Sequence, residues 1–257
     1  MTWLLDLDGV VWLAERPLPG AAEAVARLLR AGVRVLFVTN NSAFRMAEQE
    51  AKLASQGISA EGDVLTSAMA AAGLAEPGTA ALVAAGAGVV EALGARGVRV
   101  VDGPPADVVV VGFTRAFTYD LLERAATAVL GGARLIGTND DATYPTPDGP
   151  IPGGGSLLAA VAYATGAEPE VAGKPFAPMV DLARSRSGDG VHTVVGDRPS
   201  TDGRFARALG ARFALVLRGV ARAGDDHDPE PDVVADDIAS LVQWYGGGDQ
   251  GSVLGEA

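Results

Sequence analysis

The chain opens with the stretch TWLLDLDG, residues 2–9, in which a short apolar run ends in two acids and a glycine. A continuous apolar run of this length is typical of a strand that is buried on both faces of a parallel sheet. Because side chains alternate along a strand, we expect Asp6 and Asp8 to lie on the same side, and Gly9 permits a sharp exit. The stretch therefore predicts a buried strand that carries two carboxylates at its carboxyl end.

The segments that follow complete a β-α-β unit. Residues 21–31, AAEAVARLLRA, have the composition and spacing of a helix, and Gly32 is suited to end it. Residues 33–38, VRVLFV, form a second apolar run. Further runs of this kind, mostly separated by helical segments, occupy residues 80–85, 98–101, 108–112, 134–136, 192–195 and 213–217.

This alternation predicts an α/β fold with a Rossmann-like, doubly wound parallel sheet, whose ligands bind outside the carboxyl ends of the strands. Pro77 and Gly78, and the stretch PTPDGPIPGGG at residues 145–155, indicate hinges around a smaller inserted α/β domain. The last residues, from Gly246, lack periodicity and are predicted to form a frayed tail.

Composition excludes several classes of protein. The 257 residues contain no cysteine, which rules out disulfides, thiolate metal sites and cysteine nucleophiles. A net charge of -12 disfavours binding to nucleic acid or to anionic lipid surfaces, so an anionic substrate would need a local cation. No apolar stretch reaches the length of a membrane span and the N-terminus does not resemble a signal peptide, so we expect a cytoplasmic protein without a membrane partner.

The paired acids at the first strand end point to a cation. Two carboxylates packed together repel each other, and burial raises that cost, so Asp6 and Asp8 need a proton or a positive charge nearby. Magnesium is the natural candidate. The alternative is that the two acids cap a turn or the following helix.

Two further strand ends carry polar residues. Thr39, Asn40, Asn41 and Ser42 follow the second strand at a predicted helix start, where backbone N–H groups could cradle a phosphate or Ser42 could cap the helix. The segment GDRPSTD at residues 196–202 follows another strand, and there Asp197 could complete a metal site or cap a helix.

A lysine lies between these two motifs. Lys174, in Gly173-Lys174-Pro175, could place a point charge on a phosphate or on a nucleophile, or could be an ordinary solvated side chain. The order DxDG, TNNS, GKP and GDxxxxD along one chain favours the functional interpretation of all four.

The stretches LLDLDGVVW, VTNNS, GKP and GDRPSTD resemble the four motifs of the haloacid dehalogenase superfamily, and more narrowly of its subfamily IIA, which includes phosphatases of phosphoglycolate, p-nitrophenyl phosphate and glycerol phosphate. The resemblance implies a phosphoric monoester hydrolase. Asp6 would be the nucleophile that forms an aspartyl phosphate, and Asp8 would protonate the leaving oxygen and then activate water. Pro199 and Ser200 depart from the usual pattern, which is expected to alter the shape of that loop.

The same resemblance implies the remaining roles. Mg²⁺ would bind Asp6, Asp8 and Asp197, with Asp202 supporting these ligands, and Thr39, Asn40 and Lys174 would hold the phosphoryl group. Residues 1–76 and 169–257 would form the catalytic core and residues 77–168 an α/β cap, through which a homodimer could form. A TNxD-like loop would bring Asn139, Asp140 and Tyr144 to a small phosphomonoester such as glycerol phosphate or phosphoglycolate.

Two alternatives remain open. A non-enzymatic receiver-like module also combines acids, a threonine and a lysine around a phosphorylated aspartate. A nucleotide-binding protein is suggested by Gly86-Ala87-Gly88, although Glu91 stands where the third glycine of a dinucleotide fingerprint is needed. The histidines, His192 and His227, are too few for a metal cluster or a catalytic triad.

Overall fold

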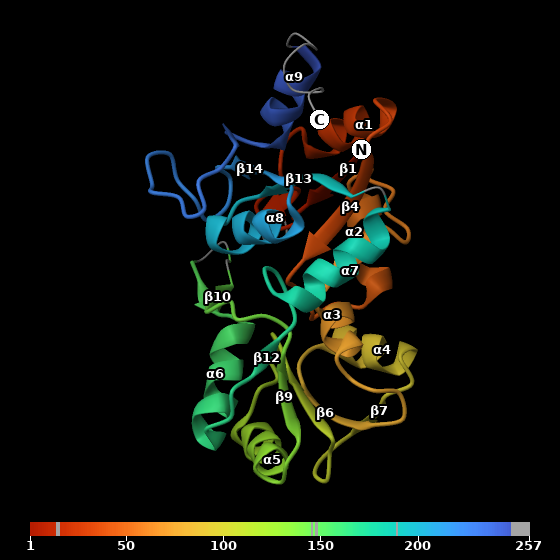
Figure 1. The fold of residues 1–257 in the computed structure, drawn as a ribbon, viewed down its shortest axis with the longest axis vertical. Helices are drawn as coiled ribbons and strands as arrows, with labels where there is room; N and C mark the ends of the chain where they lie inside the picture. Colours follow the sequence, from red (N-terminus) through yellow and green to blue (C-terminus); the bar gives the residue numbers. More distant parts are fainter. Residues whose placement is uncertain (14–15, 145, 147–148, 189, 248–257) are drawn as a thin grey trace.

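The computed structural model describes residues 1–13, 16–144, 146, 149–188 and 190–247, which form two larger parallel sheets, one above the other in Figure 1. The first sheet has the strand order β15-β14-β13-β1-β4-β5, and the second has the order β12-β9-β8-β6-β7. The strands of the first sheet are β1 (Thr2–Leu5), β4 (Arg34–Thr39), β5 (Val64–Thr66), β13 (Val191–Gly196), β14 (Arg212–Val216) and β15 (Val233–Ala235). Those of the second are β6 (Ala80–Ala84), β7 (Arg99–Val101), β8 (Val108–Val111), β9 (Arg134–Gly137) and β12 (Glu170–Val171).

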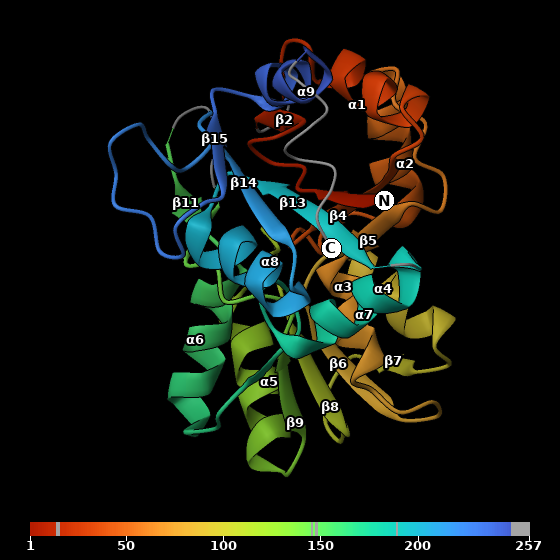
Figure 2. The same ribbon diagram turned by 45° about the horizontal axis from the view of Figure 1, so that its top comes forward.

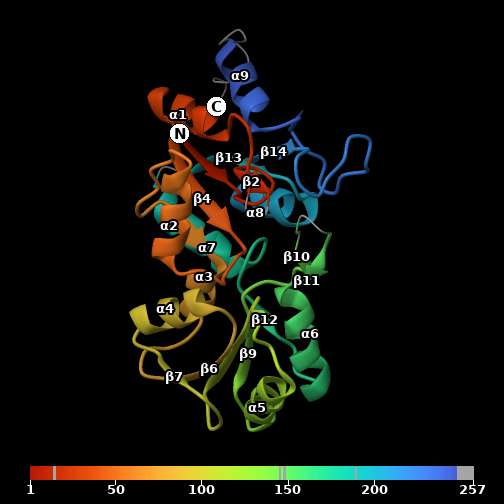
Figure 3. The ribbon, with the colours of Figure 1, turned by 180° about the vertical axis from the view of Figure 1, so that it is seen from behind.

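Helices cover both faces of each sheet, as Figures 1 and 3 show. The outer face of the first sheet packs against α1 (Ala21–Arg30), α2 (Met46–Ser55) and α9 (Ile238–Gly247). Its other face packs against α3 (Ser67–Gly73), α7 (Ala177–Ser187) and α8 (Arg204–Leu209). The second sheet is covered by α4 (Ala87–Ala95) on one face and by α5 (Tyr119–Leu130) and α6 (Gly154–Thr165) on the other. The predicted doubly wound α/β class is therefore confirmed.

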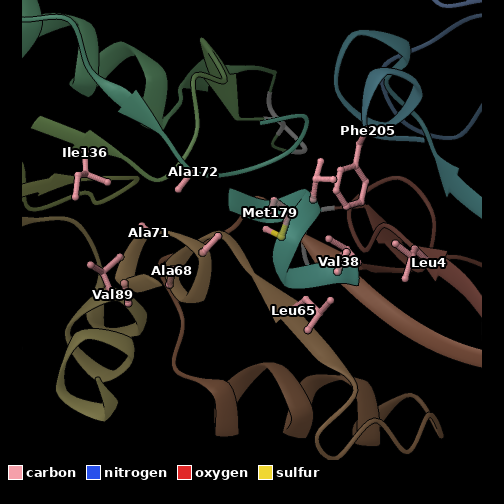
Figure 4. Close-up of a cluster of buried hydrophobic side chains, with 14 of the residues drawn as sticks. Leu4, Val38, Leu65, Ala68, Ala71, Val89, Ile136, Ala172, Met179 and Phe205 are labelled. Atoms are coloured by element: carbon pink, nitrogen blue, oxygen red, sulfur yellow. The ribbon is translucent and has the colours of Figure 1, made fainter. Parts of the chain in front are cut away.

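A continuous buried cluster joins the two sheets (Figure 4). Leu4 and Val38 of the first sheet belong to the same cluster as Ile136 of the second, and Ala71 of α3 and Met179 of α7 lie in it as well. All five side chains are buried. The second sheet is therefore held against the first by apolar packing as well as by the connecting chain segments. A close-packed core of this kind resists deformation.

The centre of the first sheet is its topological switch point. Figure 2 shows β1 beside β13, and from this pair the chain order runs outward to β4 and β5 on one side and to β14 and β15 on the other. Ligands of doubly wound sheets bind outside the carboxyl ends of strands at such a point. Asp6 directly follows β1, and Asp197 directly follows β13.

The first strand is shorter than the sequence pattern predicts. It ends at Leu5, and the backbone then turns around Leu7, whose carbonyl oxygen accepts from the Val11 N–H at 2.9 Å. Gly9 has a φ of 85°, a conformation that glycine adopts without strain. Asp8 lies beyond the end of β1, where it forms an isolated bridge with Trp12 across the turn, so strand alternation is not what places it near Asp6.

Within the two larger sheets, the three short strands β5, β12 and β15 lie outside the predicted apolar runs, because two or three residues carry too little periodicity to be recognised. The strands β6 to β9 fall inside the predicted cap of residues 77–168, whereas β12, at the edge of the same sheet, lies just beyond it. The boundaries of core and cap stay a prediction.

The predicted hinges and tail are described in part. Gly78 has a φ of 86°, and the second hinge stretch includes β11 (Ile151–Pro152), which pairs with β10 (Thr143–Tyr144). Residues 145, 147 and 148 lie outside the described residues. The predicted tail begins within α9, which extends to Gly247, and residues 248–257 lie outside the described residues. Among the described helices, none combines the length and apolarity that crossing a membrane requires.

Candidate active site

A buried lysine joins two acids from different loops. Lys174 Nζ donates to Asp6 Oδ1 at 2.8 Å, to Asp202 Oδ1 at 2.6 Å and to the carbonyl oxygen of Val38 at 3.1 Å. Lys174 is 2% exposed and Asp202 is 1% exposed. Asp6 follows β1, Lys174 follows β12, and Asp202 lies in a single π-helical turn, η1 (Pro199–Gly203), after β13. The fold thus brings residues far apart in the sequence into one ion-paired cluster.

Asp197 lies against the same cluster and is held by a loop that the sequence motifs do not include. Its Oδ2 accepts from the Val220 N–H at 2.6 Å. Two glycines leave room for its carboxylate: a Cβ at Gly9 would lie 2.6 Å from Asp197 Cγ, and a Cβ at Gly219 would overlap Asp197 Oδ2. The sequence analysis missed Gly219 and Val220 because neither residue carries a reactive side chain.

The cluster has more negative than positive groups. Burial raises the pKa of Asp6 well above its ordinary value, and the Lys174 ammonium only partly opposes this. Burial also raises the pKa of Asp197 to about 7. Burial alone would lower the pKa of Lys174, but the carboxylates of Asp202 and Asp6 raise it above its ordinary value, so the ammonium stays charged. A further cation close to Asp6 and Asp197 would relieve this imbalance.

The residues present fit a magnesium ion. One carboxylate oxygen from each of Asp6, Asp197 and Asp202 lies within 4.8 Å of the other two, and oxygen ligands are those that Mg²⁺ prefers. Asp202 is already bonded at both oxygens, since Oδ1 accepts from Lys174 and Oδ2 accepts from the Arg198 N–H at 3.1 Å. Asp6 and Asp197 are therefore suited to bind the ion directly. Asp202 is suited to support the site by holding Lys174 and the backbone of Arg198.

Gly219 offers a test of the Asp197 position. We expect Gly219→Ala to push the Asp197 carboxylate away from the Val220 N–H, because the added Cβ has no room. The affinity for Mg²⁺ should fall by about 10- to 100-fold, as measured by calorimetric titration. Gly94→Ala in α4 is the matched control, since nothing lies near a Cβ there. An unchanged affinity in Gly219→Ala would show that Asp197 does not hold the ion.

Asp8 faces the same cavity and is oriented by a tryptophan. The indole Nε1 of Trp12 donates to Asp8 Oδ1 at 3.2 Å. Trp12 is 2% exposed, and the Lys52 ammonium lies 4.0 Å from its ring centroid. The sequence analysis quoted Trp12 within LLDLDGVVW without giving it a role, because only the turn after β1 brings its side chain back to Asp8.

The polar segment after β4 is a loop, and the predicted helix start at Ser42 is wrong. The next helix, α2, begins at Met46. Ser42 Oγ is hydrogen-bonded to Thr138 Oγ1 of the second sheet's loop at 3.0 Å, so it finds a hydroxyl partner in place of a helix N–H. Thr39 lines the cavity, and its Oγ1 accepts from the Asn41 N–H at 3.0 Å.

The side chain of Asn40 joins three segments. Its Oδ1 accepts from the Lys174 N–H at 2.7 Å. Its Nδ2 donates to the Lys174 carbonyl oxygen at 3.1 Å and to Asp141 Oδ2 at 3.0 Å. Asn40 lines the cavity, and its side-chain amide holds neighbouring residues.

The second sheet supplies the opposite wall through the loop after β9. Asn139 and Tyr144 line the cavity, and Asn139 Nδ2 donates to the Asn40 carbonyl oxygen at 2.9 Å. Asp140, also expected there, is exposed and is not among the lining residues. Its neighbour Asp141 lines the cavity instead, and it occupies the final position of the TNxD pattern.

Phe113 and Arg198 also line the cavity, and neither was predicted to do so. The ring of Phe113 stacks on Tyr144 with centroids 5.0 Å apart. Arg198 Nη1 donates to Asp141 Oδ1 at 2.6 Å. The cavity that these groups enclose with the acids has a volume of about 80 Å³, which suits a compact ligand.

The glycines that suggested dinucleotide binding serve a close contact between the two units. A Cβ at Gly86 would lie 2.5 Å from Ala43 Cα, and Gly88 N donates to the Ala43 carbonyl oxygen at 3.2 Å. Glu91, which does not fit the fingerprint, accepts from the Met46 N–H at 2.7 Å and satisfies the first turn of α2.

Family models match both ends of the chain. One, described as haloacid dehalogenase-like hydrolase, matches residues 3–99, and a second, described as HAD-hydrolase-like, matches residues 171–241. The chain is 38% identical to D-glycerol 3-phosphate phosphatase of Mycobacterium tuberculosis, covering 93% of this chain and 70% of that protein. It is 35% identical to dihydroxyacetone phosphatase of Corynebacterium glutamicum, covering 95% and 92% of the two chains.

Solved structures show the same arrangement of elements. The p-nitrophenyl phosphatase from Archaeoglobus fulgidus superposes with a TM-score of 0.87 at 32% identity, over 94% of this chain and 98% of that one. The glycerol phosphate phosphatase of Mycobacterium tuberculosis in complex with magnesium superposes with a TM-score of 0.85 at 36% identity, over 94% and 77%.

Proposed function

The chain belongs to the haloacid dehalogenase-like hydrolases, and we propose that it is a magnesium-dependent phosphatase that hydrolyses a small phosphomonoester through an aspartyl phosphate on Asp6. The observation that carries this proposal is the buried cluster in which Lys174 bonds Asp6, with Asp8 and Asp197 facing the same cavity. Relatives that match most of the chain include D-glycerol 3-phosphate phosphatase and dihydroxyacetone phosphatase, which supports a phosphoric monoester hydrolase.

Asp6 is the proposed nucleophile. Lys174 holds its Oδ1, so the carboxylate is oriented before substrate binds, and this lowers the cost of reaching the transition state. A carboxylate oxygen of Asp6 forms a bond to phosphorus while the bond from phosphorus to the ester oxygen breaks. Asp8, oriented by Trp12, gives its proton to the departing oxygen.

The second step restores the enzyme. Water attacks the phosphorus of the aspartyl phosphate, Asp8 takes a proton from that water, and the bond between phosphorus and Asp6 breaks to release inorganic phosphate. Throughout, the Thr39 hydroxyl would contact the phosphoryl oxygens. The Lys174 ammonium, whose three donors bond Asp6, Asp202 and the Val38 carbonyl oxygen, would place positive charge beside them and would contact them directly only by releasing one of these bonds. At Asn40 a contact would come from the backbone, because its side-chain amide is already bonded.

A magnesium ion bound by Asp6, the Asp8 carbonyl oxygen and Asp197, with Asp202 behind them, would supply positive charge to the phosphoryl oxygens as negative charge shifts among them. Hydrogen bonds within the chain hold the acids of this site in position. The Val220 N–H donates to Asp197, and both carboxylate oxygens of Asp202 accept hydrogen bonds.

The substrate is proposed to be small. The cavity of about 80 Å³ is bounded by Asn139, Tyr144 and Phe113, which leaves room for a leaving group of a few heavy atoms with hydroxyl or carboxylate groups. Glycerol phosphate and phosphoglycolate fit this description. We also propose that residues 77–168 form the cap and that a homodimer forms through this cap.

The test is phosphate release from a panel of esters, with Mg²⁺ and with EDTA. The panel comprises glycerol phosphate, phosphoglycolate, dihydroxyacetone phosphate, p-nitrophenyl phosphate and a nucleoside monophosphate. We expect Mg²⁺-dependent release, with kcat/KM for the small esters above that for the nucleotide because Asn139, Tyr144 and Phe113 line the cavity beside the acids. No release from any ester, together with a long-lived phosphoaspartate, would favour the receiver-like alternative. A preference for the nucleotide would contradict the proposed substrate class.

A further inference from the structure

A closed ring of hydrogen bonds runs through five residues at the site. Lys174 Nζ donates to Asp202 Oδ1 at 2.6 Å, and Asp202 Oδ2 accepts from the Arg198 N–H at 3.1 Å. Arg198 Nη1 donates to Asp141 Oδ1 at 2.6 Å, and Asp141 Oδ2 accepts from Asn40 Nδ2 at 3.0 Å. Asn40 Oδ1 then accepts from the Lys174 N–H at 2.7 Å, which returns to the starting residue.

The members of the ring come from segments that follow strands of both sheets. Asn40, Arg198 and Asp202 belong to loops at the carboxyl ends of β4 and β13 in the first sheet. Lys174 lies where the chain passes from β12 to α7. Asp141 comes from the loop between β9 and β10, on the side of the second sheet. Asp141 therefore connects the loop between β9 and β10 to residues that follow strands of the first sheet.

We propose that Asp141 is a positioning residue, which seats the loop of the second sheet on the first and, through Arg198 and Asn40, fixes the placement of Asp202 and Lys174. This inference rests on the proposed function, because it concerns the same site. This role differs from that of a substrate contact. Asp141 would act through Asp202 and Lys174, and Lys174 donates to Asp6.

The chemistry of the ring makes the carboxylate of Asp141 difficult to replace. Each of its two oxygens accepts a bond from a donor, the guanidinium of Arg198 and the amide of Asn40. An asparagine side chain has one acceptor and one donor end, so in either orientation its NH₂ group would face a donor. The pair is also sheltered, with side-chain exposures of 18% for Asp141 and 22% for Arg198, so the ion pair is stronger than an exposed one.

Asp141→Asn is therefore expected to lower kcat by about 10-fold or more, because small misplacements of catalytic groups are costly. The fall should be similar for every ester of the panel, since Lys174 and Asp202 bear on Asp6 and not on the leaving group. KM should change by less than about 3-fold. A residue that touched the leaving group would instead raise KM and do so differently from ester to ester.

Two companion variants sharpen the test. Glu170→Gln is the matched control, because it breaks an exposed ion pair to Arg134 of the same 2.6 Å length, and its kinetics should equal those of the wild type. In a cycle with Arg198→Gln, the double variant should be no slower than the slower single variant, because both remove the same link. Additive losses would mean that Asp141 and Arg198 act independently and would overturn the proposal.

Hydrogen exchange tests the coupling without any turnover. In Asp141→Asn, amide exchange in the peptide covering residues 196–203 should accelerate, since Arg198 loses its anchor, whereas Glu170→Gln should leave it unchanged. Unaltered exchange and unaltered kcat would overturn the inference even if the wild type is an active phosphatase. If the wild type releases no phosphate, the proposed function fails, and exchange alone decides whether Asp141 positions the core.

Discussion

Replacing Asp6 with asparagine is expected to lower phosphate release by about 10⁴-fold or more, because an amide lacks the nucleophilic oxygen with which Asp6 is proposed to attack phosphorus. The asparagine Oδ1 can still accept from Lys174 Nζ, as Asp6 Oδ1 does at 2.8 Å, so the neighbouring groups should stay in place. The measurement is steady-state release from the best ester of the panel at saturating Mg²⁺. Turnover at the wild-type rate would refute Asp6 as the nucleophile.

In EDTA, the Asp6→Asn variant should be at least as stable as the wild type. Burial raises the pKa of Asp6, and an acid whose charged form is disfavoured in this way lowers the stability of the folded state at any pH above its unfolded pKa. Asparagine removes that charge, so the Tm of Asp6→Asn should equal or exceed that of the wild type. Asp181→Asn is the control, since that side chain is 75% exposed on α7 and should change neither rate nor Tm.

Replacing Lys174 with methionine is expected to lower the free energy of unfolding in EDTA by about 3–5 kcal/mol, the usual cost of removing one partner of a buried ion pair. Methionine keeps much of the length and the apolar stem, but it leaves Asp6 and Asp202 without their ammonium. The rate should also fall by about 100-fold or more, because the ammonium that is proposed to lie beside the phosphoryl group is lost.

Magnesium distinguishes this effect from a loss of packing. In Lys174→Met, Mg²⁺ should raise the Tm by more than it does in the wild type, because the ion supplies charge that the variant lacks. The measurement is thermal unfolding with Mg²⁺ and with EDTA. Arg30→Met serves as the control, since its ion pair to Glu23 is exposed on α1 and such pairs contribute little. Equal stability of Lys174→Met and the wild type in EDTA would contradict the buried ion-paired cluster.

The strands that carry the site could be predicted because they are buried on both faces. Such strands need continuous apolar residues, and so the acids and amides at the ends of β1, β4 and β13 stand out in the sequence. The structure brings Asp6, Lys174 and Asp202 into one hydrogen-bonded cluster. Their chemical roles stay predictions until the variants are measured.

The errors have local causes. The helix start predicted at Ser42 failed because a hydroxyl from the second sheet, Thr138, competes for the side chain that would otherwise cap the helix. The contact expected at Asp140 is made one residue later: Asp141, the last residue of the TNxD pattern, lines the cavity, and the path of the loop leaves Asp140 exposed.

By itself the sequence determined the α/β class, the central strands and the order of polar residues at their ends, because periodicity and strand-end chemistry are local properties of the chain. Only the tertiary structure decided that Gly219 and Val220 enclose Asp197 and that Arg198 binds Asp141. Those contacts join loops of different strands, and their partners are selected by how the two sheets pack together, which no local pattern records.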